Sequence, residues 1–216
     1  SCVVFDIESE STRQRCQDLA APIVDFFFTS EFVFILSEDG SVLKIDVRTN
    51  RKQLISLHDC TSDETKFNVV AVTRGDVILI GSRGEGLFSC SLWQPGGALR
   101  LKGLDRGELS KSTIHDIIVD RSSGNFIVAT DSGIDIINDD LAKIEYSSRH
   151  ASDIVATEFT ALAIDGSETI WASSFAGLYR LYASQTSIIK ELPGTSSPSI
   201  IGFAPSYANV VIADYK

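Results

Sequence analysis

Residues 114–138 read IHDIIVDRSSGNFIVATDSGIDIIN, in which two apolar runs flank a polar turn and a third run follows Gly133. The first run opens at Ile114 and the second ends in the triplet VAT at Thr130. Short apolar or alternating runs bounded by Gly, Asp, Ser and Asn are typical of β-strands joined by tight turns. This stretch therefore predicts three consecutive strands.

The same pattern occurs five times along the chain. Its second run ends in ILS, IGS, VAT, WAS and IAD, and glycines follow the first four endings at positions 40, 86, 133 and 177. The matching Ser, Thr or Asp positions are 45, 48, 43 and 41 residues apart. The five units are Ile23–Val47, Phe67–Leu92, Ile114–Asn138, Phe159–Leu181 and the stretch from Ile200 onward, with matching positions Ser37, Ser82, Thr130, Ser173 and Asp214.

A fourth, more polar strand fits after each of the first four units. Lys, Arg and Gln in these segments discourage pairing at an exposed sheet edge. Four strands in a repeat of about 43 residues predict an all-β fold, a β-propeller of four-stranded blades, because a β-solenoid would have a shorter period. The predicted fourth strands are Arg51–Leu57, Ala98–Leu104, Leu141–Ser147 and Ser187–Leu192.

The two ends of the chain complement each other. Cys2–Ile7 matches a third strand and Thr12–Leu19 a fourth, whereas the last unit stops soon after Val210–Asp214. Pairing of Cys2–Ile7 with Val210–Asp214 would close five blades into a ring without a free edge. The single predicted domain has blades at residues 20–60, 61–105, 106–150, 151–195, and 196–216 together with 1–19. The alternative is a cut from a longer array that falls in phase by accident.

The charge balance argues against two kinds of partner. The formal net charge is −10, so the surface repels phosphate backbones and anionic lipid, and neither nucleic acid nor direct membrane insertion is expected. No apolar run reaches the length of about 18 residues that a membrane helix needs, and no signal peptide opens the chain. Methionine is absent, which suggests a processed or trimmed product.

The repeat also resembles a known family. The pattern I-x-x-I-x-x-D-x-x-G-x-[IFW]-[IVW]-x-[TS]-x-x-G-[IL] is similar to the propeller repeat of two-component sensor ectodomains. IHDIIVDRSSGNFIVATDSGIDI matches it nearly throughout, and FTALAIDGSETIWASSFAGLYRL retains Asp165, Trp171, Gly177 and Leu178. The resemblance implies a propeller that binds a small ligand in a periplasmic or extracellular setting. WD-repeat propellers rank second, because the Trp-Asp and Gly-His pairs are missing.

Motifs for catalysis, cofactors or metals are not evident. GSRGEG at Gly81–Gly86 leads into another apolar run, so it predicts a turn rather than a phosphate loop. The acidic stretch Asp131–Asp140 lacks the spacing of a calcium loop, and Asp135 is expected on a solvated strand face. The three histidines have no metal-ligand spacing. We therefore predict no enzyme activity, no metal and no cofactor.

Acidic residues near the first strands leave one catalytic alternative open. Asp25 and Asp116 occupy equivalent places, and Glu158 directly precedes another first strand. Five-bladed glycosidases use two carboxylates at the inner ends of blades, so such an enzyme remains a remote alternative. Trp171, inside an apolar run, is expected to be mostly buried between blades, and its truncation to Ala to cost about 3–5 kcal/mol.

The leading functional hypothesis is a non-catalytic recognition platform for another protein or a peptide. Turns between second and third strands share one face with the loops that enter each blade, and rigidly held turns suit recognition. The alternative is a sensor ectodomain that binds a small ligand, such as a sugar, at the channel mouth. A scaffold would be cytoplasmic, a sensor extracellular or periplasmic. The candidate binding residues are Glu38, Arg83, Glu85, His115, Asp131, Glu158, Phe175 and Tyr215.

Overall fold

The computed structural model describes most of the predicted strands. The described residues are 2–6, 11–16, 19–57, 65–72, 77–91, 101–103, 113–120, 122–141, 144–148, 158–182, 189–192, 198–203 and 210–214. For some of these residues it describes the backbone but not the side chains, namely 2–6, 11–16, 90–91, 101–103, 182, 189–192, 198–203 and 210–214. Tyr215, one of the candidate binding residues, lies outside the described residues.

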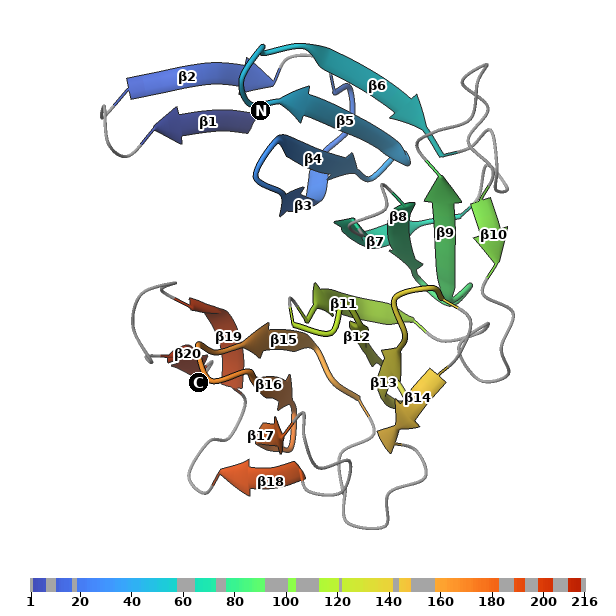
Figure 1. Cartoon of the computed structure of the whole chain (residues 1–216), viewed down its shortest axis with the longest axis vertical. Helices are drawn as coiled ribbons and strands as arrows, with labels where there is room; N and C mark the ends of the chain where they lie inside the picture. Colours follow the sequence, from blue (N-terminus) through green and yellow to red (C-terminus); the bar gives the residue numbers. More distant parts are fainter. Residues whose placement is uncertain are drawn as a thin grey trace. The chain divides into compact units, whose positions relative to one another are not determined.

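Within the described residues, twenty strands form six antiparallel sheets, whose strands are labelled in Figure 1. Four sheets have four strands each, and neighbours in the sheet are neighbours in the chain. Their strands are β3 (Ile23–Phe28), β4 (Phe32–Ser37), β5 (Ser41–Asp46) and β6 (Lys52–Ser56); β7 (Phe67–Val72), β8 (Val77–Ser82), β9 (Leu87–Ser91) and β10 (Leu101–Gly103); β11 (Ile114–Val119), β12 (Phe126–Thr130), β13 (Gly133–Ile137) and β14 (Ile144–Ser147); and β15 (Ala161–Ile164), β16 (Thr169–Ser174), β17 (Gly177–Tyr182) and β18 (Ile189–Leu192). These strands confirm the predicted repeat.

The remaining two sheets have two strands each. One pairs β1 (Cys2–Asp6) with β2 (Ser11–Cys16), and the other pairs β19 (Pro198–Phe203) with β20 (Val210–Asp214). Each therefore contains the half-blade that the sequence predicts for its end of the chain. The composite blade made from both ends, and the count of five blades, stay predictions.

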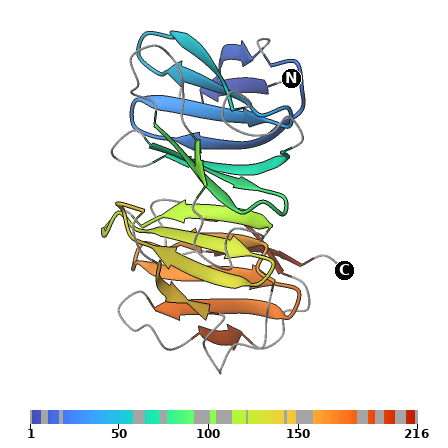
Figure 2. The ribbon, with the colours of Figure 1, turned by 90° about the vertical axis from the view of Figure 1, so that its right-hand side faces the viewer.

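The chain divides into two compact units, each with its own buried core. The first comprises Ser1–Arg83 and Leu87–Gly103, and the second Gly84–Gly86 and Leu104–Lys216. In the first, Phe34 and Leu36 pack with Phe67 and Ile80, so that one core joins the β3–β6 and β7–β10 sheets. In the second, core residues Ile127 and Ile134 of one sheet pack with Phe159 and Ile170 at the next. Figure 2 shows the two four-stranded sheets of the second unit as successive layers.

In two of the four-stranded sheets the small polar residue that ends the second strand is buried and closes the turn that follows. The Thr130 hydroxyl donates to the Gly133 carbonyl oxygen at 2.8 Å and accepts from the Ser132 N–H at 3.1 Å. In β16 the same two bonds are made by Ser174, to the Gly177 carbonyl oxygen and from the Ala176 N–H. The prediction that matched Ser173 to Thr130 was therefore wrong by one residue, because neighbouring serines occupy both positions.

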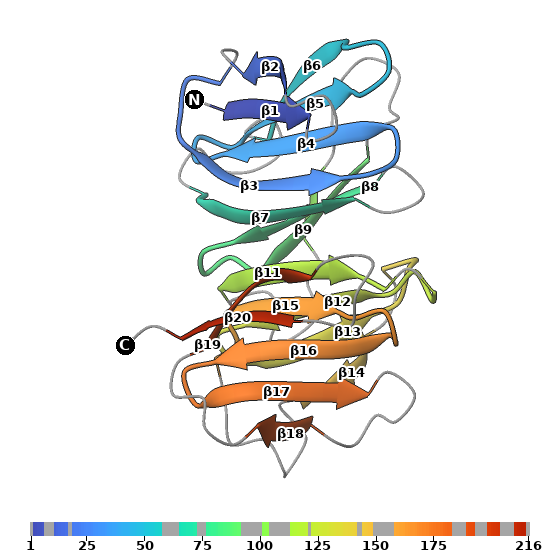
Figure 3. The same cartoon turned by 90° about the vertical axis from the view of Figure 1, so that its left-hand side faces the viewer.

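One expectation about burial was also wrong. Asp135 lies on the third strand β13 as predicted, but it is fully buried between β12 and β14 rather than solvated. Trp171 is partly buried, and its indole lies on the face of β16 opposite the one that carries Ile170 and Ala172 into the core. There its Nε1–H donates to the Asp165 carboxylate at 2.9 Å, and the Arg180 guanidinium lies 5.6 Å from its ring centroid. Figure 3 shows β16 and β17, which carry this pair, side by side.

Candidate functional site

The turns after the second strands lie beside the segments that enter the first strands. The Glu38 N–H donates to the Pro22 carbonyl oxygen at 2.8 Å, and the Arg83 N–H donates to Lys66 at 2.8 Å. Asp131 does the same with the Thr113 carbonyl oxygen at 3.2 Å. In each of these three sheets the predicted candidate residues therefore lie at the edge that contains the start of the first strand and the end of the second strand.

A β-bulge sets the direction of a side chain at this edge. In β11 the pairing with β12 shifts between Ile114 and Asp116, so His115 is the additional residue of the bulge. The same shift leaves Val24 in β3 and Asn68 in β7 as additional residues. Bulges commonly re-aim side chains next to functional sites. The bulge thus carries a different side chain in each of these three sheets: valine, asparagine and histidine.

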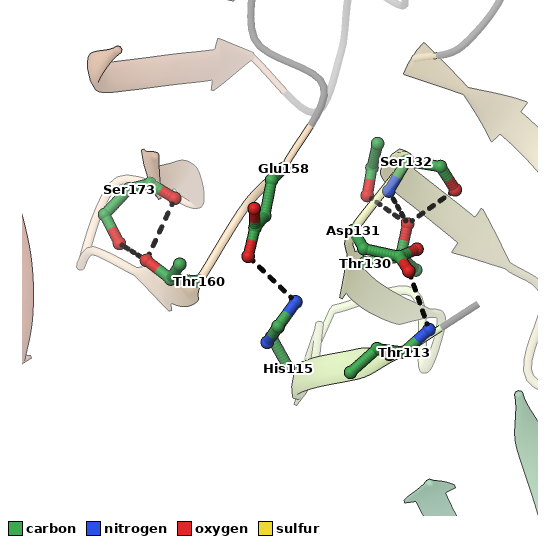
Figure 4. Close-up of polar contacts among 9 residues, drawn as sticks. Thr113, His115, Thr130, Asp131, Ser132, Glu158, Thr160 and Ser173 are labelled. Atoms are coloured by element: carbon green, nitrogen blue, oxygen red, sulfur yellow. Dashed lines mark hydrogen bonds and ion pairs between the residues drawn. The ribbon is translucent and has the colours of Figure 1, made fainter. Parts of the chain in front are cut away.

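The His115 side chain meets Glu158, which precedes β15. His115 Nε2 lies 3.5 Å from Glu158 Oε1, and the two side chains are 23% and 42% exposed. Figure 4 shows Glu158 reaching toward the imidazole from a different segment of the chain. Both side chains are partly exposed, although the His115 Nε2 atom that faces Glu158 is itself buried. This contact brings together two of the predicted candidate residues.

Polar groups flank this pair. The Thr113 N–H donates to Asp131 Oδ2 at 3.2 Å, which fixes the exposed carboxylate of the β12–β13 turn. The Thr160 and Ser173 hydroxyls lie 3.0 Å apart, and Figure 4 places them on the other side of Glu158 from Asp131. The Asp131 and Glu158 carboxylates and the His115 ring are partly or fully exposed and can accept from or donate to a polar ligand, whereas Ser173 is buried and its hydroxyl contacts Thr160. Thr113 and Thr160 had no sequence signal, because their roles depend on contacts across strands.

The remaining candidates are distributed over other turns. Glu38, Arg83, Glu85 and Phe175 are exposed, and Phe175 is the most exposed large apolar side chain, at 68%. Arg83 Nε–H donates to Asn68 Oδ1, the bulge residue of β7. Glu38, Glu85 and Phe175 lie on separate turns of the described chain. Their assignment to a binding surface stays a prediction.

An exposed aromatic pair on β3 escaped the sequence analysis. Phe26 and Phe28 are each 58% exposed, and their ring centroids lie 5.2 Å apart in an edge-to-face arrangement. The run of three phenylalanines at 26–28 was the available signal. This run predicts an apolar strand, and of its three phenylalanines Phe27 packs against the core.

The acidic residues of the first strands accept backbone hydrogen bonds. Asp25 Oδ2 accepts from the Val70 N–H at 2.8 Å, and Asp116 Oδ2 accepts from the Leu162 N–H at 2.6 Å. Burial raises the pKa of Asp25 above its usual value, against the opposing effect of hydrogen bonds from the Val70 and Phe26 N–H groups. In this part of the chain the carboxylates link neighbouring sheets.

Two kinds of feature are absent from the described residues. Among them, no three His, Cys, Asp or Glu side chains lie together as metal ligands would. Nor does the described part of the chain contain a helix with the length and apolar character needed to cross a membrane.

Comparison with known proteins identifies the fold. No family model and no curated protein sequence matches the chain. Among solved structures, the extracellular domain of BT4673 from B. thetaiotaomicron, assigned to a hybrid two-component system, aligns over 97% of this chain and 28% of that one, with a TM-score of 0.71 and 13% identity. The corresponding domain of BT3049 aligns over 88% and 27%, with a TM-score of 0.64 and 16% identity.

A third similar structure belongs to the other predicted class. It is the β-propeller domain of Cps50 (Swd1) from Myceliophteria thermophila, aligned over 92% of this chain and 68% of that one, with a TM-score of 0.68 and 10% identity. The chain spans less than a third of the length of the two ectodomains. At these identities the likeness concerns the fold, and it confirms the resemblance to sensor-ectodomain and WD-type propellers. The chain is an all-β protein of the β-propeller class.

Proposed function

We propose that this propeller is a non-catalytic recognition module that binds a protein segment or peptide at the edge formed by His115, Glu158 and Asp131. The observation that carries the proposal is the His115–Glu158 pair, in which two partly exposed ionisable groups from separate segments meet at 3.5 Å. The Thr113 N–H donates to Asp131 Oδ2, and the Asp131 N–H donates to the Thr113 carbonyl oxygen. These two hydrogen bonds hold Asp131 in place. A preorganised polar surface of this kind loses little side-chain freedom on binding.

The charge of the surface suggests the chemistry of the partner. Asp131 and Glu158 both offer carboxylate oxygens toward solvent, and the whole chain carries a net charge of −10. Lys and Arg side chains donate charge-assisted hydrogen bonds to such groups, and long-range attraction speeds their encounter. We therefore expect the partner segment to be basic. A cytoplasmic setting would accompany this function if the protein is a scaffold.

A second candidate is a ligand-sensing ectodomain, as the notable likeness to the BT4673 and BT3049 extracellular domains suggests. The exposed rings of Phe26 and Phe28 favour a sugar, because the C–H faces of a pyranose pack against aromatic rings. In that case the protein would be extracellular or periplasmic. The predicted ligand would then depend on the aromatic pair rather than on His115 and Glu158.

One screen separates these functions. The full chain is immobilised and presented both to a random peptide library and to an array of oligosaccharides, alongside two carboxylate variants and the double variant Phe26→Ala/Phe28→Ala. Glu158→Gln alters the proposed surface, and Glu168→Gln alters an exposed carboxylate in the β15–β16 turn as a matched control. Basic peptides that bind the parent and Glu168→Gln but not Glu158→Gln support recognition of a protein segment.

The other outcomes are equally informative. Sugar binding that survives Glu158→Gln and is lost in Phe26→Ala/Phe28→Ala supports the sensor instead. If peptides and sugars bind all four proteins alike, or neither class binds the parent, both functions are contradicted. Hydrolysis of an arrayed sugar by the parent would contradict the non-catalytic assignment.

A further inference from the structure

Two equivalent carboxylates connect neighbouring sheets in the same way. Asp25 of β3 accepts the Val70 N–H of β7 at 2.8 Å, and Asp116 of β11 accepts the Leu162 N–H of β15 at 2.6 Å. Each bond joins the first strands of two consecutive sheets within one compact unit. Hydrogen bonds to a charged acceptor are stronger than neutral ones. Each carboxylate is thus a clasp between two sheets.

The clasps occur in alternate sheets. Strand register identifies equivalent positions, because Asp25 pairs with Leu36 and Asp116 with Ala129, the residues just before Ser37 and Thr130. The same register position holds Val69 in β7 and Ala161 in β15, opposite Gly81 and Ser173. Neither valine nor alanine can accept a hydrogen bond through its side chain. Of the four complete sheets, the first and third therefore carry the clasp.

The hydrophobic cores have the same arrangement. The described members of one core, including Leu36 and Ile78, come from the two sheets that Asp25 joins. The described members of another, including Ala129 and Ala172, come from the two sheets that Asp116 joins. The carboxylate hydrogen bond and the hydrophobic core therefore join the same two sheets. Contiguous segments that share a core tend to open together, as one cooperative unit.

We propose that the chain is built from two-sheet modules, β3–β10 and β11–β18, and that each module opens as a separate cooperative unit held by its own carboxylate clasp. Asp116 is then also a positioning residue, because it fixes β11, which carries His115, to the strand that follows Glu158. The proposal concerns stability within each module and does not depend on the identity of any ligand.

Amide hydrogen exchange on the full chain tests the modules separately. Asp25→Ala should lower protection in β3–β9 by about 10- to 100-fold and leave β11–β17 within about twofold of the parent. Asp116→Ala should give the reverse pattern. Asp25→Asn and Asp116→Asn keep a side-chain acceptor oxygen of nearly the same shape, and each should retain most of the protection. Similar losses in the Asn and Ala variants would overturn the role of the acceptor.

The pattern across the chain decides the main claim. If either Ala variant lowers protection equally in both modules, the chain is one cooperative unit and the proposal is wrong. It is also wrong if neither variant changes protection. Should an Ala variant fail to fold, the milder core changes Ile80→Val and Ile170→Val test the same separation, since each removes one methylene from a different core.

Discussion

Asp116 accepts a hydrogen bond from the backbone N–H of Leu162, 46 residues further along the chain, at 2.6 Å. The other carboxylate oxygen accepts from the Ile117 N–H at 2.8 Å. Asp25 repeats the arrangement with Val70, 45 residues away. A backbone N–H at this inner position would otherwise need water or another acceptor. The same sheet-to-sheet hydrogen bond therefore occurs at equivalent positions in two of the sequence repeats.

We predict that Asp25→Asn is at least as stable as the parent at pH 7, whereas Asp25→Ala loses about 1–3 kcal/mol of unfolding free energy. The amide oxygen keeps the bond to the Val70 N–H, and the buried negative charge disappears. The pKa of Asp25 is raised from 3.8 in the folded state, so the folded protein binds this proton more readily than the unfolded one. Stability contributed by Asp25 therefore falls as pH rises from 3.8 through the raised value.

Denaturant melts at several pH values measure this difference. The advantage of Asp25→Asn over the parent should grow across that interval and then level off. An advantage that shrinks as pH rises would show that the carboxylate is stabilising in its ionised form.

Asp165 should show the opposite pH dependence. Burial raises its pKa, but hydrogen bonds from Trp171 Nε1–H and from the Thr169 and Ser167 N–H groups outweigh it, and the pKa lies below 3.8. Its stabilising effect is therefore present above that value and is lost as pH falls through the lowered pKa. Asp165→Ala should cost about 1–3 kcal/mol at pH 7, measured by urea unfolding. A cost that persists unchanged at pH 2 would contradict the ionised acceptor.

Trp171→Ala should be less damaging than a fully buried tryptophan would predict. The indole is half-buried and rests on Arg180 and Asp165, so we expect a loss of about 1–3 kcal/mol instead of 3–5. Trp171→Phe keeps most of the ring contact and removes the N–H donor, which makes it the matched control. A loss above about 4 kcal/mol for the Ala variant would place the ring in the core after all.

The buried hydroxyl of Thr130 should be needed for its turn. Thr130→Val removes the bonds to the Gly133 carbonyl oxygen and from the Ser132 N–H at a fully buried position, so we expect a loss of about 1–3 kcal/mol. Thr130→Ser keeps the hydroxyl and should lose less. A loss in the Val variant that is no larger than the loss in the Ser variant, measured in thermal melts, would contradict the role of the hydroxyl.

The strands were predictable because their signal is local. Apolar runs and turn residues repeat with a fixed period, and the glycine at 133 and its equivalents mark the turns. The sequence could not predict which serine of β16 corresponds to Thr130, since both Ser173 and Ser174 fit the pattern. The hydrogen bond from Ser174 to the Gly177 carbonyl oxygen identifies Ser174. Burial of Asp135 was missed because alternation predicts which face a side chain takes, but not that a neighbouring layer covers that face.

The candidate site was only partly predictable for the same reason. His115 and Glu158 were both selected from their places at the starts of first strands, but their contact depends on the bulge at Ile114–Asp116. Thr113 and Thr160 are ordinary polar residues in sequence. They matter at this edge because strands far apart in the chain bring them to it.

The predicted closure of the ring has a direct test. Deletion of residues 1–7 removes β1, the pairing partner of β2, and with it the strand expected to pair with Val210–Asp214. Because unpaired edges promote aggregation, we expect a far larger loss than ordinary trimming of a terminus causes. Thermal melting and light scattering of the shortened protein are the measurements. A soluble product that melts within a few degrees of the parent would contradict closure through these strands.

The central claim is recognition at the His115–Glu158 edge, and calorimetric titration tests it most directly. A basic peptide selected on the parent should bind Glu158→Gln and Asp131→Asn at least about tenfold more weakly, since each loses a charged acceptor for Lys or Arg. The control Glu168→Gln should bind within about twofold of the parent. Equal affinity for all four proteins would contradict the account.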